Sequence, residues 1–418
     1  MLQLPRQSHQ GDSFYTQVIP LLQFALSLEG RIREQPFQIF GKGRSRPLQL
    51  RGRSTVCYYL LAFPQQHTRV PATRKRGGRE SFTMKKILVT GGAGFIGSNF
   101  VRHMLREHPD ITIVVLDALT YAGNLENLLD VHKNPNFYFF HGDIRDEKLV
   151  NNLVPNVDAV INFAAETFVD RSIHDPGNFI TTDVVGTFRL LEAARHHGVE
   201  KFIHISTDEV YGSVEEGSSV ETDLLEPNSP YSSSKAGSDL LARSYYVTYD
   251  VPVIVTRASN NYGPYQHPEK LIPFFISNAI DGKPLPVYGD GQQIRDWLYV
   301  EDHCRAIETV LLKGVPGEIY NVGAGYERTN MQVTRGILEC LGKDDSLIKY
   351  VTDRPGHDRR YSLNCDKLKS LGWSPKVSFE EGLPLTVDWY VDNEAWWRRI
   401  KEGESYQDFH SAWYKERV

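Results

Sequence analysis

Residues 85–97 read "KKILVTGGAGFIG", and this stretch decides the fold class of the chain. A short aliphatic and β-branched run, typical of a buried strand, leads into Gly91, Gly94 and Gly97 at the spacing GxxGxxG. "GSNFVRHMLREH" (97–108) then has the apolar spacing of a helix. Between a strand and a helix, such glycines permit a tight turn, the approach of a pyrophosphate to backbone amides, and close packing of the helix. A glycine triplet alone also occurs in ordinary turns, but this context predicts a dinucleotide site.

Further along the chain, short apolar runs alternate with helical patterns. Helical segments such as "TFRLLEAARHHG" (187–198) separate the later runs. Continuous apolar strands alternating with helices indicate a parallel sheet covered on both faces. We therefore expect an α/β fold, a doubly wound parallel sheet of the Rossmann type with a smaller C-terminal lobe. The apolar runs are "ITIVVLD" (111–117), "FYFFHGDI" (137–144), "DAVINFAA" (158–165) and "KFIHIST" (201–207).

The pattern changes after about residue 260, where prolines and turns multiply. Five of the six tryptophans fall between Trp373 and Trp413. We expect a dinucleotide-binding domain over 84–260 and a substrate-binding lobe over 261–418, with some strands and helices interleaved. Doubly wound sheets bind ligands beyond the carboxyl ends of their strands, so the lobe would form one wall of a cleft.

Composition is that of an ordinary globular protein: 418 residues, 40% hydrophobic, 24% charged, with a net charge of −5. No run approaches 18 consecutive apolar residues, so we expect no membrane span. The four cysteines (Cys57, Cys304, Cys340 and Cys365) are far apart without CxxC spacing. This favours a reducing, cytoplasmic location without disulfides or a zinc site.

Residues 1–83 differ from the rest in charge, with 13 Lys and Arg against 4 Asp and Glu. The segment fits a transit peptide, a basic arm for nucleic acid, or upstream sequence that precedes a natural start at Met84. The third interpretation is favoured, since neither an amphipathic helix nor interleaved aromatic and basic residues are present. We expect residues 1–83 to be disordered or not part of the natural chain. A chain beginning at Met84 should fold and turn over as well as the full chain. No nucleic-acid partner is expected.

The type of cofactor is indicated by Asp117, which ends the second apolar run. A carboxylate at that position accepts hydrogen bonds from ribose hydroxyls and repels a 2′-phosphate. NAD is therefore favoured over NADP.

Candidate catalytic groups follow the fifth apolar run. In "YSSSK", Tyr231 and Lys235 lie four residues apart on one face of a helix. A phenol that acts as a base near neutrality needs its pKa lowered by roughly 3 units, about 4 kcal/mol, which a nearby ammonium and a cationic nicotinamide can supply. YxxxK is common by chance, but the hydroxyl of Thr207 completes a set suited to oxidising a hydroxyl group to a carbonyl.

Two adjacent acids follow Thr207 in "STDEVYG" (206–212). On a plain loop, Asp208 and Glu209 would serve solvation alone. Neighbouring carboxylates disfavour ionising together, which helps to keep one of them protonated.

Taken together, these motifs resemble the extended short-chain dehydrogenase/reductase family over essentially all of 84–418, and within it the dTDP-glucose 4,6-dehydratases. Epimerases of that family look similar at the glycines and YxxxK but lack the acidic pair. Further matching segments are "DALTYAGN" (117–124), "AAETFVDRSI" (164–173), "YSSSKAGSD" (231–239), "SNNYGPYQHPEKLIP" (259–273), "VYGDGQQIRDWLYVEDHC" (287–304) and "DRPGHDRRY" (353–361).

The resemblance implies a role for each catalytic group. Tyr231, assisted by Lys235, takes the C4 hydroxyl proton as hydride leaves C4 for NAD, and Thr207 hydrogen-bonds the resulting ketone. Glu209 abstracts the C5 proton and Asp208 protonates the departing C6 hydroxyl. Hydride then returns to C6, so the product is a 4-keto-6-deoxy sugar nucleotide.

Binding residues and oligomeric state are also implied by the resemblance. Helices around 178–198 and 230–249 are expected to pair into the four-helix bundle of a homodimer. The cofactor contacts are Gly91, Gly94, Phe95, Ile96, Gly97, Asp117, Leu119, Thr120, Asp143, Ile144, Phe163, Ala164, Ala165, Glu166, Thr182, Tyr231, Lys235 and Asn261. The contacts to a dTDP-glucose substrate are Thr167, Thr207, Asn260, Lys270, Leu271, Pro286, Val287, Tyr288, Arg295, Asn330, Asp353, Arg354, Pro355, Gly356 and His357.

Three positions depart from the commonest family form: Phe168 replaces His, Asn162 replaces His and Asp183 replaces Asn. None belongs to the proton- or hydride-transfer set. His303 has no partners that suggest a metal, so no metal is expected. Two alternatives stay open: a 4,6-dehydratase or epimerase for a UDP- or GDP-linked sugar, and a catalytically idle binding protein.

Overall fold

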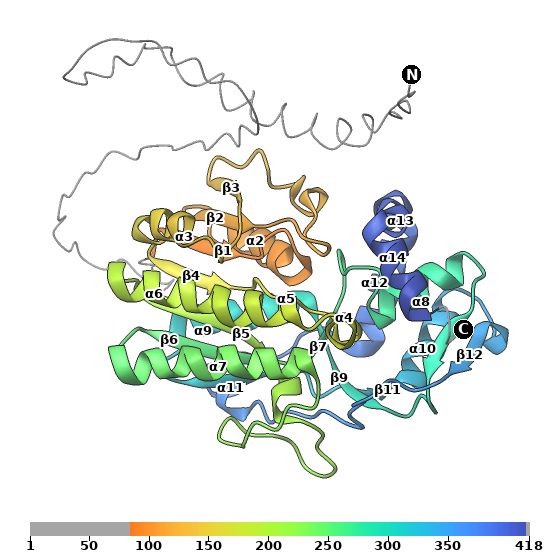
Figure 1. Ribbon diagram of the computed structural model, residues 1–418. Helices are drawn as coiled ribbons and strands as arrows, with labels where there is room; N and C mark the ends of the chain where they lie inside the picture. Colours follow the sequence, from red (N-terminus) through yellow and green to blue (C-terminus); the bar gives the residue numbers. More distant parts are fainter. Residues whose placement is uncertain (1–83, 415–418) are drawn as a thin grey trace, which may run out of the picture. The chain divides into compact units, whose positions relative to one another are not determined.

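A seven-stranded parallel sheet organises the part of the chain that the structure describes, residues 84–414 of a computed structural model (Figure 1). Its strand order is β10-β6-β5-β4-β1-β2-β3. The order reverses between β1 and β4, and a crevice at such a reversal is where doubly wound sheets bind ligands. The predicted fold class is confirmed. The strands are β1 (Lys86–Thr90), β2 (Thr112–Asp117), β3 (Phe137–His141), β4 (Ala159–Asn162), β5 (Lys201–Thr207), β6 (Val253–Ala258) and β10 (Ile319–Val322).

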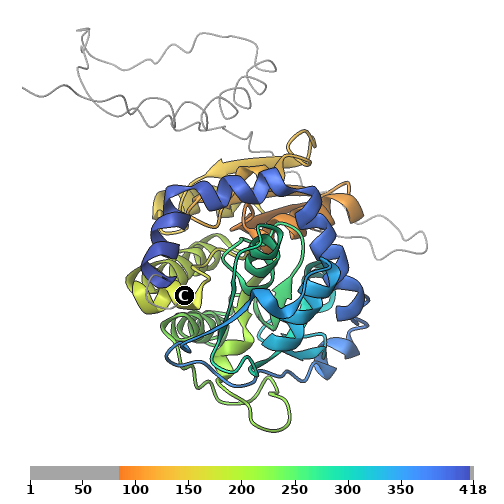
Figure 2. The ribbon, with the colours of Figure 1, turned by 90° about the vertical axis from the view of Figure 1, so that its right-hand side faces the viewer.

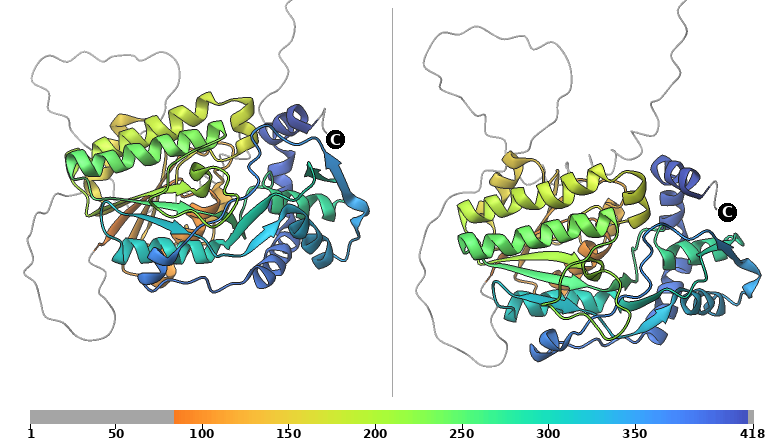
Figure 3. Two further views of the ribbon diagram at one scale, coloured as in Figure 1. Left: turned by 90° about the horizontal axis from the view of Figure 1, so that it is seen from below. Right: turned by 60° about the horizontal axis from the view of Figure 1, so that its bottom comes forward.

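Successive side chains of each central strand point to opposite faces of the sheet, so each face carries apolar residues and packs against its own hydrophobic core. In β1, Ile87 and Val89 join one hydrophobic core and Leu88 joins the other. The first core lies against α2 (Phe95–Glu107) and α9 (Val300–Lys313). The second lies against α3 (Glu147–Leu153), α6 (Thr187–His197) and α7 (Pro230–Tyr249), and Figure 3 shows α6 and α7 side by side.

The second half of the chain builds a smaller lobe with its own aromatic core, which includes Trp297, Trp396, Trp397 and Trp413. Its strands are β7 (Asn260–Tyr262), β8 (Leu285–Tyr288), β9 (Ile294–Tyr299), β11 (Glu327–Thr329) and β12 (Ile348–Val351). Its helices include α8 (Leu271–Ile280), α10 (Asn330–Cys340), α12 (Phe379–Asp392), α13 (Glu394–Glu402) and α14 (Glu404–Tyr414).

Two elements of the second half, α9 and β10, return to the large sheet. The boundary at residue 260 stays a prediction, because all described residues fall within a single compact unit, Gly78–Val418. The remaining short elements are η1 (Leu125–Leu128), η2 (Val154–Asn156), α4 (Val169–His174), α5 (Gly177–Phe179), η3 (Ile180–Gly186), η4 (Asp208–Tyr211), η5 (Asp345–Leu347) and α11 (Asp366–Ser370).

The helical segment expected around 178–198 contains an irregularity that the sequence did not reveal. Between α5 and α6, η3 is π-helical rather than α-helical. Such π segments are rare and frequently occur at functional sites.

The expectations for residues 1–83, Cys57 among them, lie outside the described residues. Within 84–414, no helix is long and apolar enough to cross a membrane. Cys304, Cys340 and Cys365 are free thiols.

Packing at Gly97 yields a first prediction. A Cβ added there would lie 2.2 Å from the carbonyl oxygen of Gly91, which is backbone and cannot move aside as a flexible side chain does. We expect Gly97→Ala to lower the free energy of unfolding by about 2–3 kcal/mol or more, because α2 must shift off β1. Urea unfolding measures this.

The matched control is Gly177→Ala, where the nearest atom to an added Cβ is Asp175 Oδ1 at 3.7 Å. That change should stay within about 0.5 kcal/mol of the parent chain. Equal losses at both glycines would contradict the packing argument.

Candidate active site

The glycine turn between β1 and α2 is shaped to receive an anion. Gly91 has a left-handed φ of +68°, and a Cβ there would lie 2.7 Å from the amide nitrogen of Ala164. A Cβ at Gly94 would meet only the Gly91 carbonyl, so its other side is open. The first turn of α2 carries neither a capping side chain nor an acidic residue. Its free amides and positive dipole end therefore suit a pyrophosphate.

Asp117 fixes this turn to the end of β2. Its Oδ2 accepts a hydrogen bond from the Ala93 amide at 2.8 Å, and its Oδ1 accepts one from the Leu119 amide at 2.8 Å. Burial raises the pKa of the carboxyl. Asp117 thus holds both loops that border the cofactor edge, and its contact with a ribose stays a prediction.

The predicted catalytic residues come together from β5, η4 and α7. Thr207 ends β5, and its hydroxyl donates to Asp208 Oδ1 at 3.2 Å and accepts from the Glu209 amide at 3.3 Å. Tyr231, in the first turn of α7, lies within hydrogen-bonding reach of that hydroxyl. Lys235, one turn along α7, donates to the Ile205 carbonyl at 2.6 Å. Both a base and its ammonium neighbour are therefore buried beside the acidic pair.

Burial sets the protonation of Tyr231 and Lys235. Burial raises the pKa of Tyr231 well above its usual range, and the carboxylates of Glu209 and Asp183 raise it further. Burial lowers the pKa of Lys235, against the attraction of Asp183 and Asp239. The phenol is therefore protonated in the chain alone, and it needs an added positive charge nearby to act as a base.

The two adjacent acids have different environments. Burial raises the pKa of Asp208 well above its usual range, the Glu209 carboxylate raises it further, and Oδ2 has no hydrogen-bond partner in the described chain. Burial also raises the pKa of Glu209, but Arg354, Arg295 and Lys270 all oppose that rise. These environments favour Asp208 as the proton donor and Glu209 as the acceptor, and the two roles stay predictions.

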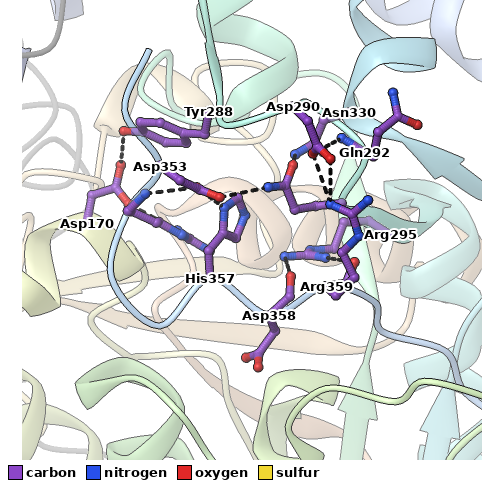
Figure 4. A network of polar contacts seen from close by, with 12 residues as sticks. Asp170, Tyr288, Asp290, Gln292, Arg295, Asn330, Asp353, His357, Asp358 and Arg359 are labelled. Carbon is purple, nitrogen blue, oxygen red and sulfur yellow. Dashed lines mark hydrogen bonds and ion pairs between the residues drawn. The ribbon is translucent and has the colours of Figure 1, made fainter. Parts of the chain in front are cut away.

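A polar network joins residues of the smaller lobe to Asp170 (Figure 4). The Arg354 guanidinium pairs with Asp170 Oδ1 at 3.0 Å, and the Tyr288 hydroxyl donates to Asp170 Oδ2 at 2.9 Å. His357 Nδ1 lies 2.6 Å from Asp353 Oδ1. The network brings residues predicted as substrate contacts, from β8 and the loop after β12, together with Asp170 of α4.

Several members of this network were missed from the sequence. Asp170 pairs with Arg354 across 184 residues, Gln293 donates to Asp353 at 3.0 Å, and the Asp358 carbonyl accepts from Arg295 at 2.9 Å. Asp170 lies inside the quoted motif 164–173, but its partners are too remote for any spacing to indicate them.

Asp183 and Asn162, two of the departures from the family form, are tied into the frame of the site. Asp183 lies in the π-helical η3, where Oδ1 accepts from the Glu166 amide at 2.8 Å and Oδ2 accepts from the Ser234 hydroxyl at 2.6 Å. Asn162 Oδ1 accepts from the Thr90 hydroxyl at 2.6 Å. Burial raises the pKa of Asp183 to about 6, and burial with the Asp183 charge raises the pKa of Glu166 to about 7.

Several other predicted cofactor and substrate contacts have side chains that are bonded to other residues of the chain or buried in a core. The Asp143 carboxylate is held by Arg145 at 2.6 Å, and the Val287 side chain is buried in the core of the smaller lobe. Val287 can therefore offer a ligand its backbone alone. The Lys270 ammonium donates to the Thr167 carbonyl, and His303 Nδ1 lies 2.9 Å from Asn261 Oδ1.

No group of three or more metal-ligating side chains that could hold an ion occurs among residues 84–414.

A doubly wound sheet with this glycine turn and a Thr–Tyr–Lys set at the ends of β5 and α7 defines an extended short-chain dehydrogenase/reductase. Residues 88–386 match the family described as GDP-mannose 4,6 dehydratase, and the chain belongs to this family.

Individual relatives support the same assignment. The low-salt glycan biosynthesis protein Agl12 of Haloferax volcanii is 52% identical over 308 residues, covering 74% of this chain and 99% of the relative. The dTDP-glucose 4,6-dehydratase of Streptomyces niveus is 51% identical over 321 residues, 76% of this chain and 96% of the relative. A crystal structure of DesIV, a dTDP-glucose 4,6-dehydratase from Streptomyces venezuelae with NAD bound, is 53% identical, with a TM-score of 0.74 over 76% of this chain and all of DesIV.

The buried Asp183 carboxyl yields a prediction on stability and pH. Its folded pKa of about 6 lies above the reference near 3.8, so the folded state binds more protons across that interval. The parent chain should therefore lose stability as pH rises from about 4 to 6, a loss that Asp183→Asn removes. We expect the variant's advantage in free energy of unfolding to grow by on the order of 1 kcal/mol between pH 5 and pH 7.

Urea unfolding at the two pH values measures this difference. The matched control is Asp388→Asn, which makes the same change of side chain on the exposed face of α12. A gain for Asp183→Asn that does not change with pH would show that the carboxyl does not titrate in this interval.

Proposed function

We propose that this chain is an NAD-dependent dTDP-glucose 4,6-dehydratase, a hydro-lyase that forms dTDP-4-dehydro-6-deoxy-glucose. The observation that carries the proposal is the acidic pair of buried Asp208 and half-buried Glu209 beside Thr207, Tyr231 and Lys235. The sequence identity to dTDP-glucose 4,6-dehydratases, 51% and 53% for the two described above, supports the choice of sugar nucleotide. An epimerase has no need for a second acid and base, and a catalytically idle protein has no need for any of these five groups.

The residues of the glycine turn fit NAD. The amides of the first turn of α2 would hold the pyrophosphate, and the Asp117 carboxylate would disfavour a 2′-phosphate. When bound, NAD supplies a hydride acceptor for C4 and, once reduced, a hydride donor for C6. Its positive nicotinamide charge near the phenol also offsets the burial that keeps Tyr231 protonated.

The first step is oxidation at C4. Tyr231 removes the hydroxyl proton while the C4–H bond breaks and its electron pair leaves as hydride. Lys235 stabilises the resulting phenolate, and the Thr207 hydroxyl donates a hydrogen bond to the new carbonyl oxygen. That carbonyl makes the neighbouring C5–H acidic.

Elimination follows from the asymmetry of the acidic pair. Glu209 takes the C5 proton, the C5–C6 double bond forms, and the C6–O bond breaks as Asp208 delivers its proton to the leaving hydroxyl. One water departs. Return of hydride to C6 and of a proton to C5 then completes the product without an external oxidant.

Cations around the acidic pair match a diphosphate. Arg354, Arg295 and Lys270 oppose the rise that burial gives to the pKa of Glu209, so all three cations lie near this carboxyl. The planar guanidinium groups of two of them suit phosphate oxygens. The same cations would hold the sugar next to Glu209.

Separation of oxidation from elimination is a testable consequence. Asp208→Asn and Glu209→Gln keep size and most hydrogen bonds but cannot transfer a proton. Both variants should still oxidise C4, so NADH should accumulate on the enzyme, with absorbance near ~340 nm. Product formation should fall by on the order of 10²–10⁴-fold.

Two controls sharpen this experiment. Tyr231→Phe should block the first step, so that neither NADH nor product appears. Glu209→Gln should abolish exchange of the C5 hydrogen with deuterated solvent, whereas Asp208→Asn should leave some exchange. Normal C5 exchange in the Glu209 variant would assign the base to another group.

The oligomeric state follows from an exposed apolar surface on η3 and α7. Ile180, Val185, Leu240, Val247 and Tyr249 are all exposed, and contiguous apolar surface of this kind marks interaction sites. We propose that this surface pairs with its copy across a two-fold axis as a four-helix bundle. Figure 3 shows the helices open to one side.

Charge on that surface should prevent pairing. Leu240 and Val247 lie seven residues apart on one face of α7, so Leu240→Glu with Val247→Glu buries two carboxylates in the bundle. We expect a monomer by light scattering at micromolar concentration. Leu385→Glu, on α12, is the control, because Leu385 and Leu240 are equally exposed, at 53%. A parent chain that is monomeric would overturn the proposal.

A cytoplasmic location is also proposed, on the support of widely spaced cysteines and a nucleotide-linked substrate.

A further inference from the structure

The C-terminal helix α14 reaches the proposed nucleotide subsite through Trp413. The indole Nε1–H of Trp413 donates a hydrogen bond to the Tyr288 hydroxyl at 2.7 Å. The Tyr288 hydroxyl donates in turn to Asp170 Oδ2 at 2.9 Å, and Asp170 Oδ1 pairs with Arg354 at 3.0 Å. A single chain of polar contacts therefore joins α14, β8, α4 and the loop after β12.

The hydrogen bonds of the Tyr288 hydroxyl have defined donors and acceptors. A phenol has one proton to donate and lone pairs to accept. Since Tyr288 gives its proton to the buried carboxylate of Asp170, its acceptor side receives the indole N–H at 2.7 Å, and the Tyr414 hydroxyl lies further away, at 3.4 Å. Fixing both sides of the oxygen leaves the phenol ring one orientation, with its edge against His357 at a centroid distance of 6.1 Å and 87° between planes.

The helix that carries Trp413 is itself anchored beside the site. Phe409 stacks on Trp413 with centroids 6.1 Å apart and packs edge-on against Phe168 at 5.7 Å. The Arg171 guanidinium lies over the Phe409 ring at 4.4 Å and pairs with the buried Glu269 at 2.9 Å. The indole is thus held in register with the end of β8.

The other end of the C-terminal segment is attached to the cofactor half. Trp396 on α13 donates to Asn127 Oδ1 at 3.0 Å, and Arg399 pairs with Glu126 of η1 at 2.5 Å. Figure 2 shows the dark blue C-terminal helices running from the smaller lobe along the large sheet. The segment spans the two halves that form the cleft.

From this geometry we propose that Trp413 is a positioning residue for the nucleotide subsite: it orients Tyr288 and, through Asp170, the guanidinium of Arg354. The proposal rests on the proposed function, since it assumes that this subsite binds a nucleoside diphosphate. It assigns Trp413 no part in proton or hydride transfer, so its effect falls on substrate affinity.

The test is Trp413→Phe in the full chain. Phenylalanine keeps an aromatic ring against Phe409 but removes the N–H donor. We expect the KM for dTDP-glucose to rise about 3- to 10-fold, the range of one lost hydrogen bond, with kcat unchanged. Calorimetry with dTDP should show the same loss of affinity, and the affinity for NAD should not change.

A matched control lies in the same segment. Trp397 on α13 is also buried, and its Nε1–H donates to the Tyr390 carbonyl at 2.8 Å, outside the subsite. Trp397→Phe removes the same kind of bond, so a purely structural role would give both variants the same effect. We expect dTDP affinity to change in the Trp413 variant alone.

A double variant tests the route of the effect. If Trp413 acts through the Tyr288 hydroxyl, adding Trp413→Phe to Tyr288→Phe should change dTDP affinity by less than about twofold. Additive losses, or unchanged affinity in Trp413→Phe, would overturn the proposal. If Trp413→Phe does not fold, the dTDP affinity of Tyr288→Phe is measured in its place. An unchanged affinity in Tyr288→Phe would also overturn the proposal.

Failure of the proposed function would look different. In that case the parent chain itself would not bind dTDP. Failure of the positioning role would leave the parent chain binding dTDP and Trp413→Phe binding it equally well.

Discussion

The close approach of α2 to the end of β1 is the constraint on which the rest of the structure depends. It exists because Gly97 has no side chain, so the helix can lie directly on the carbonyl of Gly91. This contact sets the start of α2 at the carboxyl edge of the sheet, beside the point where the strand order reverses. Asp117 then fixes the turn by accepting two backbone hydrogen bonds. The turn and the end of β2 are therefore tied together by contacts within the chain itself.

Burial at the same edge provides the chemistry. Asp208 and Glu209 are neighbours in sequence, yet only Glu209 is opposed in its pKa rise by three cations. Two side chains with the same functional group thereby receive different environments, as the proposed acid and base require. The arrangement carries a cost, because buried charges such as Asp183 disfavour the folded state at higher pH. The folded state is therefore less stable at the pH values at which the buried Asp183 carboxyl is charged.

The two halves of the described chain are joined by polar contacts as well as by the cores. Asp170, which follows β4, pairs with Arg354 of the smaller lobe, and α13 and α14 contact both the η1 region and Tyr288. The nucleotide subsite is therefore assembled from segments that belong to neither half alone. In the proposed function, substrate affinity depends on how these segments are held, whereas proton transfer depends on β5, η4 and α7.

The sequence by itself determined what local pattern controls. Strand and helix periods located the sheet, glycine spacing located the turn, and a four-residue spacing placed Tyr231 and Lys235 on one face of α7. It did not reveal the π-helical η3, the cations around Glu209, or the partners of Asp170 and Trp413. Trp413 and Tyr288 are 125 residues apart, and Asp170 and Arg354 are 184 apart. Contacts between such remote segments leave no period in either segment, so only the tertiary structure decided them.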